Sequence, residues 1–190
     1  MVQSVLKADS DSKISSLKLM KELLGAKFEV KEFCNEWILV TYDLPNTLEG
    51  NRARLEFFRK ARRIGAVPHT ESVYLLPWTP EAELAAVDLS DKGTLFLWVS
   101  RARNEIEALG VTRQYDMQIK KQITELETRV IKMEDYLENG KDGLANRMLE
   151  KTLDITKALQ EIIVRRGSAD LFEDYEPLVS RVWELHKQLN

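Results

Sequence analysis

The sequence predicts an α+β protein, and three patterns support this fold class. One helical pattern occupies the first residues, short apolar runs alternate with helical stretches between residues 36 and 110, and only helical spacing follows residue 113. We therefore expect an N-terminal helical lead over residues 1–35, a mixed domain over residues 36–110 and a C-terminal helical domain over residues 113–190.

The lead is expected to contain a single amphipathic helix. Apolar side chains recur at helical spacing from Ile14 to Leu24, and Gly25 stands where such a helix would end. Because only one helix is predicted over residues 13–24, a winged helix-turn-helix does not fit into the lead.

The mixed domain is expected to run strand, helix, strand, strand, helix, strand. β-branched and aromatic residues favour the strands, and Pro80 suits the first turn of the second helix. This order is typical of a ferredoxin-like module. The expected strands span residues 37–42, 66–70, 72–77 and 94–100, and the expected helices span residues 50–64 and 79–87.

The predicted sheet is apolar on both faces. Along the strand at residues 94–100, alternation places Phe96 and Trp98 on one face and three aliphatic side chains on the other. A sheet of this kind needs a cover on both faces. The second cover is another subunit, the C-terminal helices of the same chain, or nucleic-acid bases stacked on Phe96, Trp98 and Tyr74; burial is the usual role of such aromatic residues.

The C-terminal domain is expected to form three helices. The first carries a heptad seam and ends at Asn139-Gly140, Asp142 caps the second, and Pro177 lies near the first turn of the third. The short link makes the first two helices an antiparallel hairpin, so we expect either a three-helix bundle or an intermolecular bundle. The seam, which is also the candidate dimer contact, consists of Ile119, Ile123, Leu126, Val130, Met133 and Leu137.

The composition excludes several classes of protein. The chain has 190 residues, of which 44% are apolar and 31% charged, and no apolar run reaches the length of about 18 residues that spans a bilayer. We therefore expect no membrane partner, and the single cysteine and missing export signal favour the cytoplasm. With a net charge of −3, any contact with nucleic acid must come from a local basic patch.

The mixed domain resembles a small module found in three protein families. The matching stretches are Trp37 to Pro45, Arg52-Ala-Arg54, Arg62 to Gly65 and Ser72 to Pro77, about 40 contiguous residues together with the following helix and strand. The families are the ChrB regulators of chromate resistance (in their N-terminal domain), the PaaX-type repressors of phenylacetate catabolism (in their middle domain) and the small dimeric CRISPR-associated adaptation nucleases. The resemblance implies a ferredoxin-like, homodimeric protein with either a regulatory function or nuclease activity.

Asp43 ends the first predicted strand and has two interpretations. In the CRISPR-associated family, an aspartate in this position is the proposed metal ligand, so the resemblance implies a Mg²⁺ site that activates water on a phosphodiester. The other interpretation is that Asp43 caps the turn that follows it. No acid or histidine partner accompanies Asp43 in the sequence. We therefore favour the turn. We expect no catalytic residue, metal or cofactor unless the chain is a nuclease, in which case Asp43 is the candidate ligand of Mg²⁺.

The helix at residues 50–64 is the candidate nucleic-acid interface. Between residues 52 and 63 it carries six basic side chains against one acid, Glu56. Arginine suits phosphate because its guanidinium donates two parallel hydrogen bonds, although a basic helix can also be an ordinary solvated surface. The candidate binding residues are Arg52, Arg54, Arg59, Lys60, Arg62 and Arg63.

The remaining reactive residue types carry no recognisable motif. His69 and His186 are expected on the surface, and Cys34 is expected to be a small apolar filler. We expect a non-enzymatic homodimeric regulatory or nucleic-acid-associated protein, with DNA or RNA as the candidate partner. The alternatives are a nuclease that uses Asp43 and an adaptor that binds another protein through its C-terminal helices.

Overall fold

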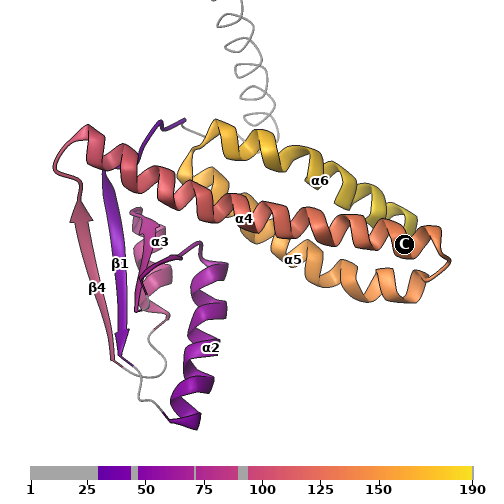
Figure 1. Cartoon of the computed structure of the whole chain (residues 1–190), viewed down its shortest axis with the longest axis horizontal. Coiled ribbons are helices and arrows are strands. Elements are labelled where there is room, and N and C mark those ends of the chain that lie inside the picture. Colours follow the sequence, from indigo (N-terminus) through magenta and orange to yellow (C-terminus); the bar gives the residue numbers. More distant parts are fainter. Residues whose placement is uncertain (1–29, 44–46, 71, 90–93, 190) are drawn as a thin grey trace, which may run out of the picture.

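The computed structural model describes residues 30–43, 47–70, 72–89 and 94–189, which form four strands and five helices (Figure 1). The predicted α+β class and the order of the elements are confirmed, and the helix predicted over residues 13–24 lies outside the described residues. The strands are β1 (Glu36–Asp43), β2 (Val67–Thr70), β3 (Val73–Pro77) and β4 (Thr94–Arg101), and the helices are α2 (Leu48–Arg63), α3 (Pro80–Val87), α4 (Glu105–Glu138), α5 (Asp142–Arg166) and α6 (Ala169–Leu189).

The four strands form one antiparallel sheet in the order β2-β3-β1-β4. β1 occupies the centre, since it pairs with β3 on one side and along its whole length with β4 on the other. β2 and β4 are therefore the two edges of the sheet. The β2 edge is short and irregular, whereas β4 pairs with β1 over eight consecutive residues without a bulge.

Helices α2 and α3 cover one face of the sheet. Ile38, Val40 and Leu76 from the strands pack there against Phe57 of α2 and small alanines of α3. Tyr74 lies on this same face, is buried, and has its ring 5.2 Å from that of Phe57. Tyr74 is therefore a core residue, and the suggestion that it stacks on nucleic-acid bases was wrong.

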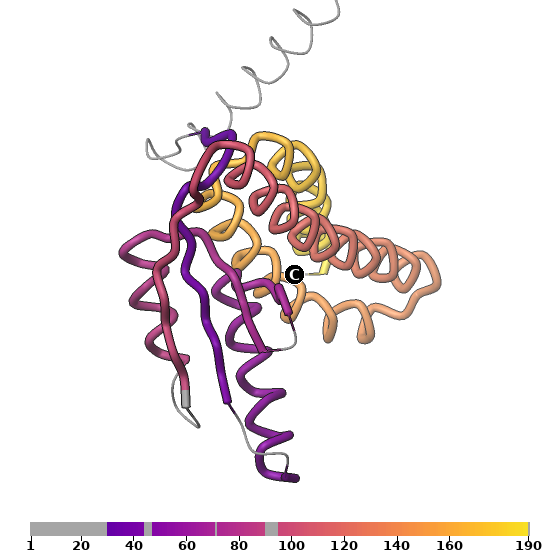
Figure 2. Tube along the Cα trace, turned by 60° about the vertical axis from the view of Figure 1, so that its left-hand side comes forward, coloured from indigo at the N-terminus to yellow at the C-terminus, as the bar shows by residue number. Residues whose placement is uncertain are grey.

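Among the described residues, the helical bundle covers the opposite face only in part. Trp37 packs its ring 5.4 Å from that of Tyr115 on α4, and Val67 and Leu75 join the same core. The lower ends of β1 and β4 lie clear of all three bundle helices (Figures 1 and 2). Phe96 and Trp98, opposite Thr41 and Leu39 of β1, are consequently 52% and 60% exposed.

Helix α4 begins eight residues before the expected start of the helical domain. Asn104 caps it by accepting a hydrogen bond from the N–H of Glu107, so the helix starts at Glu105 directly after β4. The boundary expected between residues 110 and 113 thus lies inside α4. One continuous helix joins the sheet to the bundle.

The bundle consists of α4, α5 and α6 of a single chain, which confirms the three-helix alternative. Ile119, Ile123, Leu126, Val130 and Met133 of the seam are buried and Leu137 is partly buried, all in one core with residues of α5 and α6. The seam is therefore filled within the chain, and it offers no free surface to a second copy.

The ends of α5 and α6 differ from the expectation. Asp142 is the first residue of α5 rather than its cap, in a position where a negative charge favours the helix dipole. α6 starts at Ala169 because Ser168 accepts a hydrogen bond from the N–H of Leu171. Pro177 consequently lies inside α6 and not in its first turn.

The sheet and the bundle are fastened together around the end of α2. The Tyr115 hydroxyl donates to the carbonyl of Gly65 at 2.8 Å, and Arg165 donates to the carbonyl of Ile64 at 2.7 Å. Gly65 has φ +83°, and a Cβ placed there would lie 2.7 Å from Ile162. These contacts hold the C-terminal end of α2 against α4 and α5.

Among the described helices, none has the length and apolar character needed to cross a bilayer.

Candidate nucleic-acid interface

Helix α2 begins where the sequence provides a cap and ends where it provides a glycine. Thr47 accepts a hydrogen bond from the N–H of Gly50 at the start, and Gly65 follows the last turn with a positive φ. Phe57 and Ala61 face the sheet. The basic residues of the last two turns are therefore left on the side that faces the bundle and the solvent.

A cleft of about 650 Å³ lies between the end of α2 and the bundle helices α4 and α5. Its floor is apolar and comes from the bundle, mainly Leu126, Ile155, Ala158 and Ile162. Its walls are polar, and basic side chains outnumber acidic ones by six to three. The six basic residues are Arg59, Arg62, Arg63, Arg129, Lys151 and Lys157.

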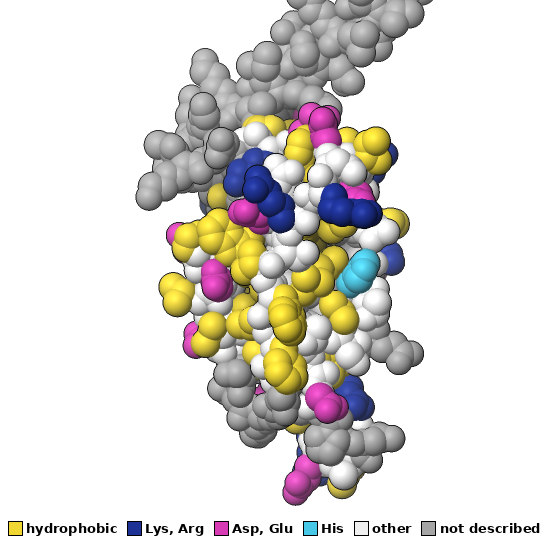
Figure 3. Space-filling view, turned by 90° about the vertical axis from the view of Figure 1, so that its left-hand side faces the viewer, with side chains coloured by type: hydrophobic (Ala, Val, Ile, Leu, Met, Phe, Trp, Pro, Cys, Tyr) yellow, Lys and Arg dark blue, Asp and Glu magenta, His cyan; other side chains and the backbone are white. Residues whose placement is uncertain are grey.

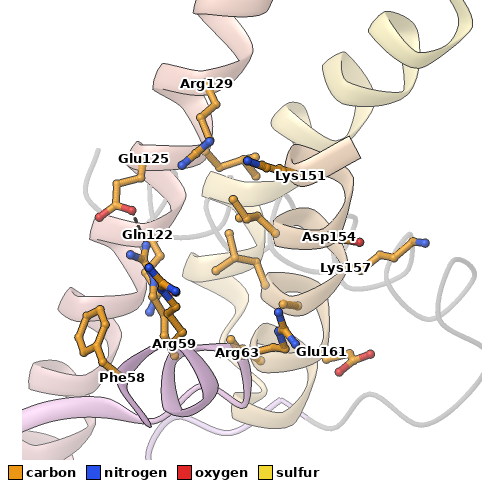
Figure 4. A pocket seen from close by; sticks show the side chains of 16 residues that line it. Phe58, Arg59, Arg63, Gln122, Glu125, Arg129, Lys151, Asp154, Lys157 and Glu161 are labelled. Carbon is orange, nitrogen blue, oxygen red and sulfur yellow. Dashed lines mark hydrogen bonds and ion pairs between the residues drawn. The ribbon is translucent and has the colours of Figure 1, made fainter. Parts of the chain in front are cut away.

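Five of the six cations, Lys157 among them, have no acidic partner among the described residues. Arg59 and Arg63 of α2, Arg129 of α4 and Lys151 of α5 form no ion pair within the described part of the chain. Figure 4 shows Arg129 and Lys151 at one end of the cleft and Arg59 and Arg63 at the other, while Lys157 points away from them. The cleft is therefore locally positive on a chain whose net charge is −3.

Arg62 has a structural role at the cleft wall. Its guanidinium donates to Gln122 at 3.2 Å and pairs with Glu125, both on α4. This bridge holds α2 to α4 from within the cleft. It also neutralises Glu125, the acid one helical turn before Arg129 on α4.

The edge of the cleft carries one exposed aromatic ring. Phe58 is 40% exposed and lines the cleft beside Arg59. Cations that can bind phosphate oxygens, next to a flat apolar ring, form a combination that suits a nucleic-acid backbone with an unstacked base. An apolar floor with cationic walls can equally hold a smaller organic anion.

Half of the candidate residues predicted on this helix do not line the cleft. Arg52 and Arg54 lie in the first half of α2, about 10 Å along the helix axis from the cleft arginines at a rise of about 1.5 Å per residue. Arg54 donates to Asn51 at 3.0 Å, and Lys60 lies 3.8 Å from Glu56. The predicted basic residues of α2 are thus divided between the cleft, which Arg59, Arg62 and Arg63 line, and the part of the helix outside it.

Sequence analysis missed the bundle half of the cleft. Arg129 and Lys151 lie more than sixty residues beyond the end of α2 in the sequence, and their charges are typical of any solvated helix surface. The only signal is local: Arg129 directly precedes the seam residue Val130, so it lies beside the buried stripe of α4. Nothing in the sequence shows that α2 docks there.

Asp43 is exposed at the end of β1, opposite Thr94 in the pairing with β4. Over the described residues, no group of three or more His, Cys, Asp or Glu side chains is placed to hold a metal ion. Asp43 is also absent from the residues that line the basic cleft. The described residues therefore provide no three-residue ligand group for the nuclease alternative.

Cys34 is buried two residues before β1, as expected for an apolar filler. Burial raises the pKa of its thiol, so the reactive thiolate is disfavoured. His69 is exposed on β2, as expected, and His186 lies on α6 with its ring 5.6 Å from that of Trp183. None of these three residues lines the basic cleft.

Comparison with known proteins leaves the chain without a family. No known protein family and no curated protein matches the sequence. Among solved structures, an uncharacterized protein from Mycobacterium tuberculosis is similar with 10% identity and a TM-score of 0.38, over 97% of this chain and 72% of the other. A likeness of this size carries no argument about fold or function.

Proposed function

We propose that this chain is a non-enzymatic homodimeric regulatory protein that associates with DNA or RNA through the basic cleft between α2, α4 and α5. The observation that carries this proposal is the convergence of Arg59, Arg63, Arg129 and Lys151, without acidic partners among the described residues, on one cleft. Such a site gathers several cations around one cleft, which suits a ligand with repeated negative charges.

The mode of binding follows from the types of side chain. Contacts from arginine and lysine to phosphate oxygens carry no information about base identity. The one amide side chain among the residues that line the cleft, Gln122, accepts a hydrogen bond from Arg62, so its oxygen is not free for a base edge. The association is therefore largely indifferent to sequence, with Phe58 as the candidate ring for an unpaired base.

The fold of residues 36–101 supports the resemblance of the mixed domain to modules of the ChrB and PaaX regulators. The order β-α-β-β-α-β, the antiparallel sheet order β2-β3-β1-β4 and the placement of α2 and α3 on one face are features of a ferredoxin-like module. We propose this assignment for the mixed domain, and with it the likeness to the ChrB and PaaX modules.

The test is a polarisation assay with labelled duplex DNA, single-stranded DNA and RNA at about 50 mM salt, where electrostatic contacts are strong. The wild type should bind at least one of the three, and the double variant Arg59→Glu, Arg129→Glu should lose most of that affinity. The matched control is Arg52→Glu, Arg54→Glu, which makes the same charge change on the part of α2 outside the cleft. Wild-type protein that binds none of the probes, or a control that loses as much affinity as the cleft variant, would contradict the proposal.

A further inference from the structure

We infer that two copies of this chain pair through the free edge of β4, strand against strand, to form one continuous eight-stranded sheet. The inference deepens the homodimer part of the proposed function, because it names the surface that the second copy occupies. It rests on three features of the described residues: the difference between the two sheet edges, the self-complementary sequence of β4, and the apolar side chains exposed on both sides of that edge.

The two edges of the sheet differ in how they are protected. β2 is four residues long, contains Pro68 and has an irregular register with β3, all of which hinder the addition of another strand. β4 is eight residues long, contains no proline and has no charged residue before Arg101. Its regular pairing with β1 leaves a straight row of backbone groups at the outer edge.

The sequence of β4 pairs with itself in antiparallel orientation about Leu97. In this register Leu97 lies opposite the partner's Leu97, Phe96 lies opposite the partner's Trp98, and Leu95 lies opposite the partner's Val99. Every pair in this set is apolar, and the aromatic pair is of the kind that stabilises neighbouring strands. With a two-fold axis at Leu97, both chains use the same residues for the same contacts, as a closed dimer requires.

Apolar side chains are exposed on both faces beside this edge. Phe96 and Trp98 are exposed on the open face, and Val99 of β4 with Leu84 and Val87 of α3 are exposed on the other side. Figure 3, which faces the β4 edge, shows hydrophobic side chains gathered over the middle of this face, with acidic side chains among them toward its left margin. A second sheet continued from β4 would cover both groups at once, whereas bases stacked on Phe96 and Trp98 would leave the α3 side in water.

The first experiment measures mass by light scattering at micromolar concentration. The wild type should give twice the chain mass of 22.0 kDa, and Trp98→Lys, which places a charge opposite the partner's Phe96, should give 22.0 kDa. Trp183→Lys is the matched control, because Trp183 is similarly exposed but lies on α6, and it should remain dimeric. A wild-type monomer, or a Trp98→Lys dimer of unchanged stability, would overturn the inference.

The second experiment tests the register and does not depend on disrupting the edge. In a Cys34→Ser background, Leu97→Cys should form an intermolecular disulfide under mild oxidation, since directly opposed residues lie about 4.5–5.5 Å apart at their Cα atoms. Val99→Cys should not crosslink, because the two copies of residue 99 would be offset by four residues, about 13 Å along the strand. Crosslinking at Val99→Cys and not at Leu97→Cys would overturn this pairing.

The two proposals fail separately. A dimer with the predicted crosslink that binds no nucleic acid would leave this interface standing and remove the proposed function. Conversely, a monomer that binds nucleic acid through Arg59 and Arg129 would keep the cleft and remove the β4 interface.

Discussion

Arg166 of α5 and Asp116 of α4 form a two-pronged ion pair in the interior, with Nε to Oδ1 and Nη2 to Oδ2 distances of 2.8 Å each. The remaining donors of the guanidinium reach the carbonyls of Lys31 at 2.7 Å and Glu32 at 3.1 Å. Only 2% of the Arg166 side chain is exposed. This one residue therefore ties two bundle helices to the segment that leads into β1.

Removing the acid from this pair should be costly. Asp116→Ala leaves the buried Arg166 charge without its carboxylate, and such a loss costs on the order of 3–5 kcal/mol of unfolding free energy. Urea unfolding followed by circular dichroism measures the change. The control is Asp174→Ala, which breaks the half-exposed Lys120–Asp174 pair and should cost less than about 1 kcal/mol. Equal losses in both variants would show that burial of Arg166 does not matter.

Gly65 should tolerate no side chain. Gly65→Ala meets two penalties, a positive φ of 83° and a clash with Ile162, and together they should cost about 2–4 kcal/mol. Gly140→Ala is matched in conformation, with φ +66°, but has open space around it, so it should cost only about 1–2 kcal/mol. Thermal or urea unfolding of both variants checks this order, and the reverse order would mean that α2 does not press on α5 at this point.

The seam of α4 should behave as core. Leu126 is fully buried in the bundle, so Leu126→Ala should cost about 2–5 kcal/mol, whereas Ile131→Ala on the exposed face of the same helix should cost well below 1 kcal/mol. Leu126→Lys should unfold the bundle instead of separating a folded dimer into folded monomers. Unchanged melting temperature in Leu126→Lys would contradict the intramolecular seam.

Cys34 should react slowly in the folded protein. Because burial raises the pKa of its thiol, a smaller fraction is thiolate at a given pH than for a free cysteine, and access is also restricted. Alkylation near pH 8 should be much slower in the native chain than in urea, and the native rate should still be rising with pH above the ordinary thiol pKa of about 8.5. Equal rates in both states would contradict the burial of Cys34.

Local patterns were sufficient to predict the elements and insufficient to predict how they meet. Apolar alternation and heptad spacing place β4 and the seam of α4 because each pattern lies within one element. The expected start of α6 near Pro177 was wrong because Ser168, a stronger capping signal, begins the helix earlier. Ser168 directly follows Gly167, the glycine that ends α5, so the two helices are joined without a loop that would mark the boundary.

In the candidate site, too, the residues within one helix were predicted and their neighbours from other helices were not. Arg59 and Arg63 stand out within one basic helix, so the sequence predicts them. Arg129 and Lys151 become neighbours of that helix only because Tyr115 and Gly65 hold the end of α2 against the bundle. A contact between residues fifty positions apart has no periodic signal in a single sequence.

The salt dependence of nucleic-acid binding tests the cleft most directly. If Arg59, Arg63, Arg129 and Lys151 each neutralise one phosphate, the slope of log affinity against log salt should be about −3.6 per bound chain for B-DNA. Arg129→Gln should make that slope shallower by about 1, and Arg52→Gln should leave it unchanged. A slope that changes with Arg52→Gln and stays constant with Arg129→Gln would contradict the account, because it would place the bound backbone on the outer half of α2 and not in the cleft.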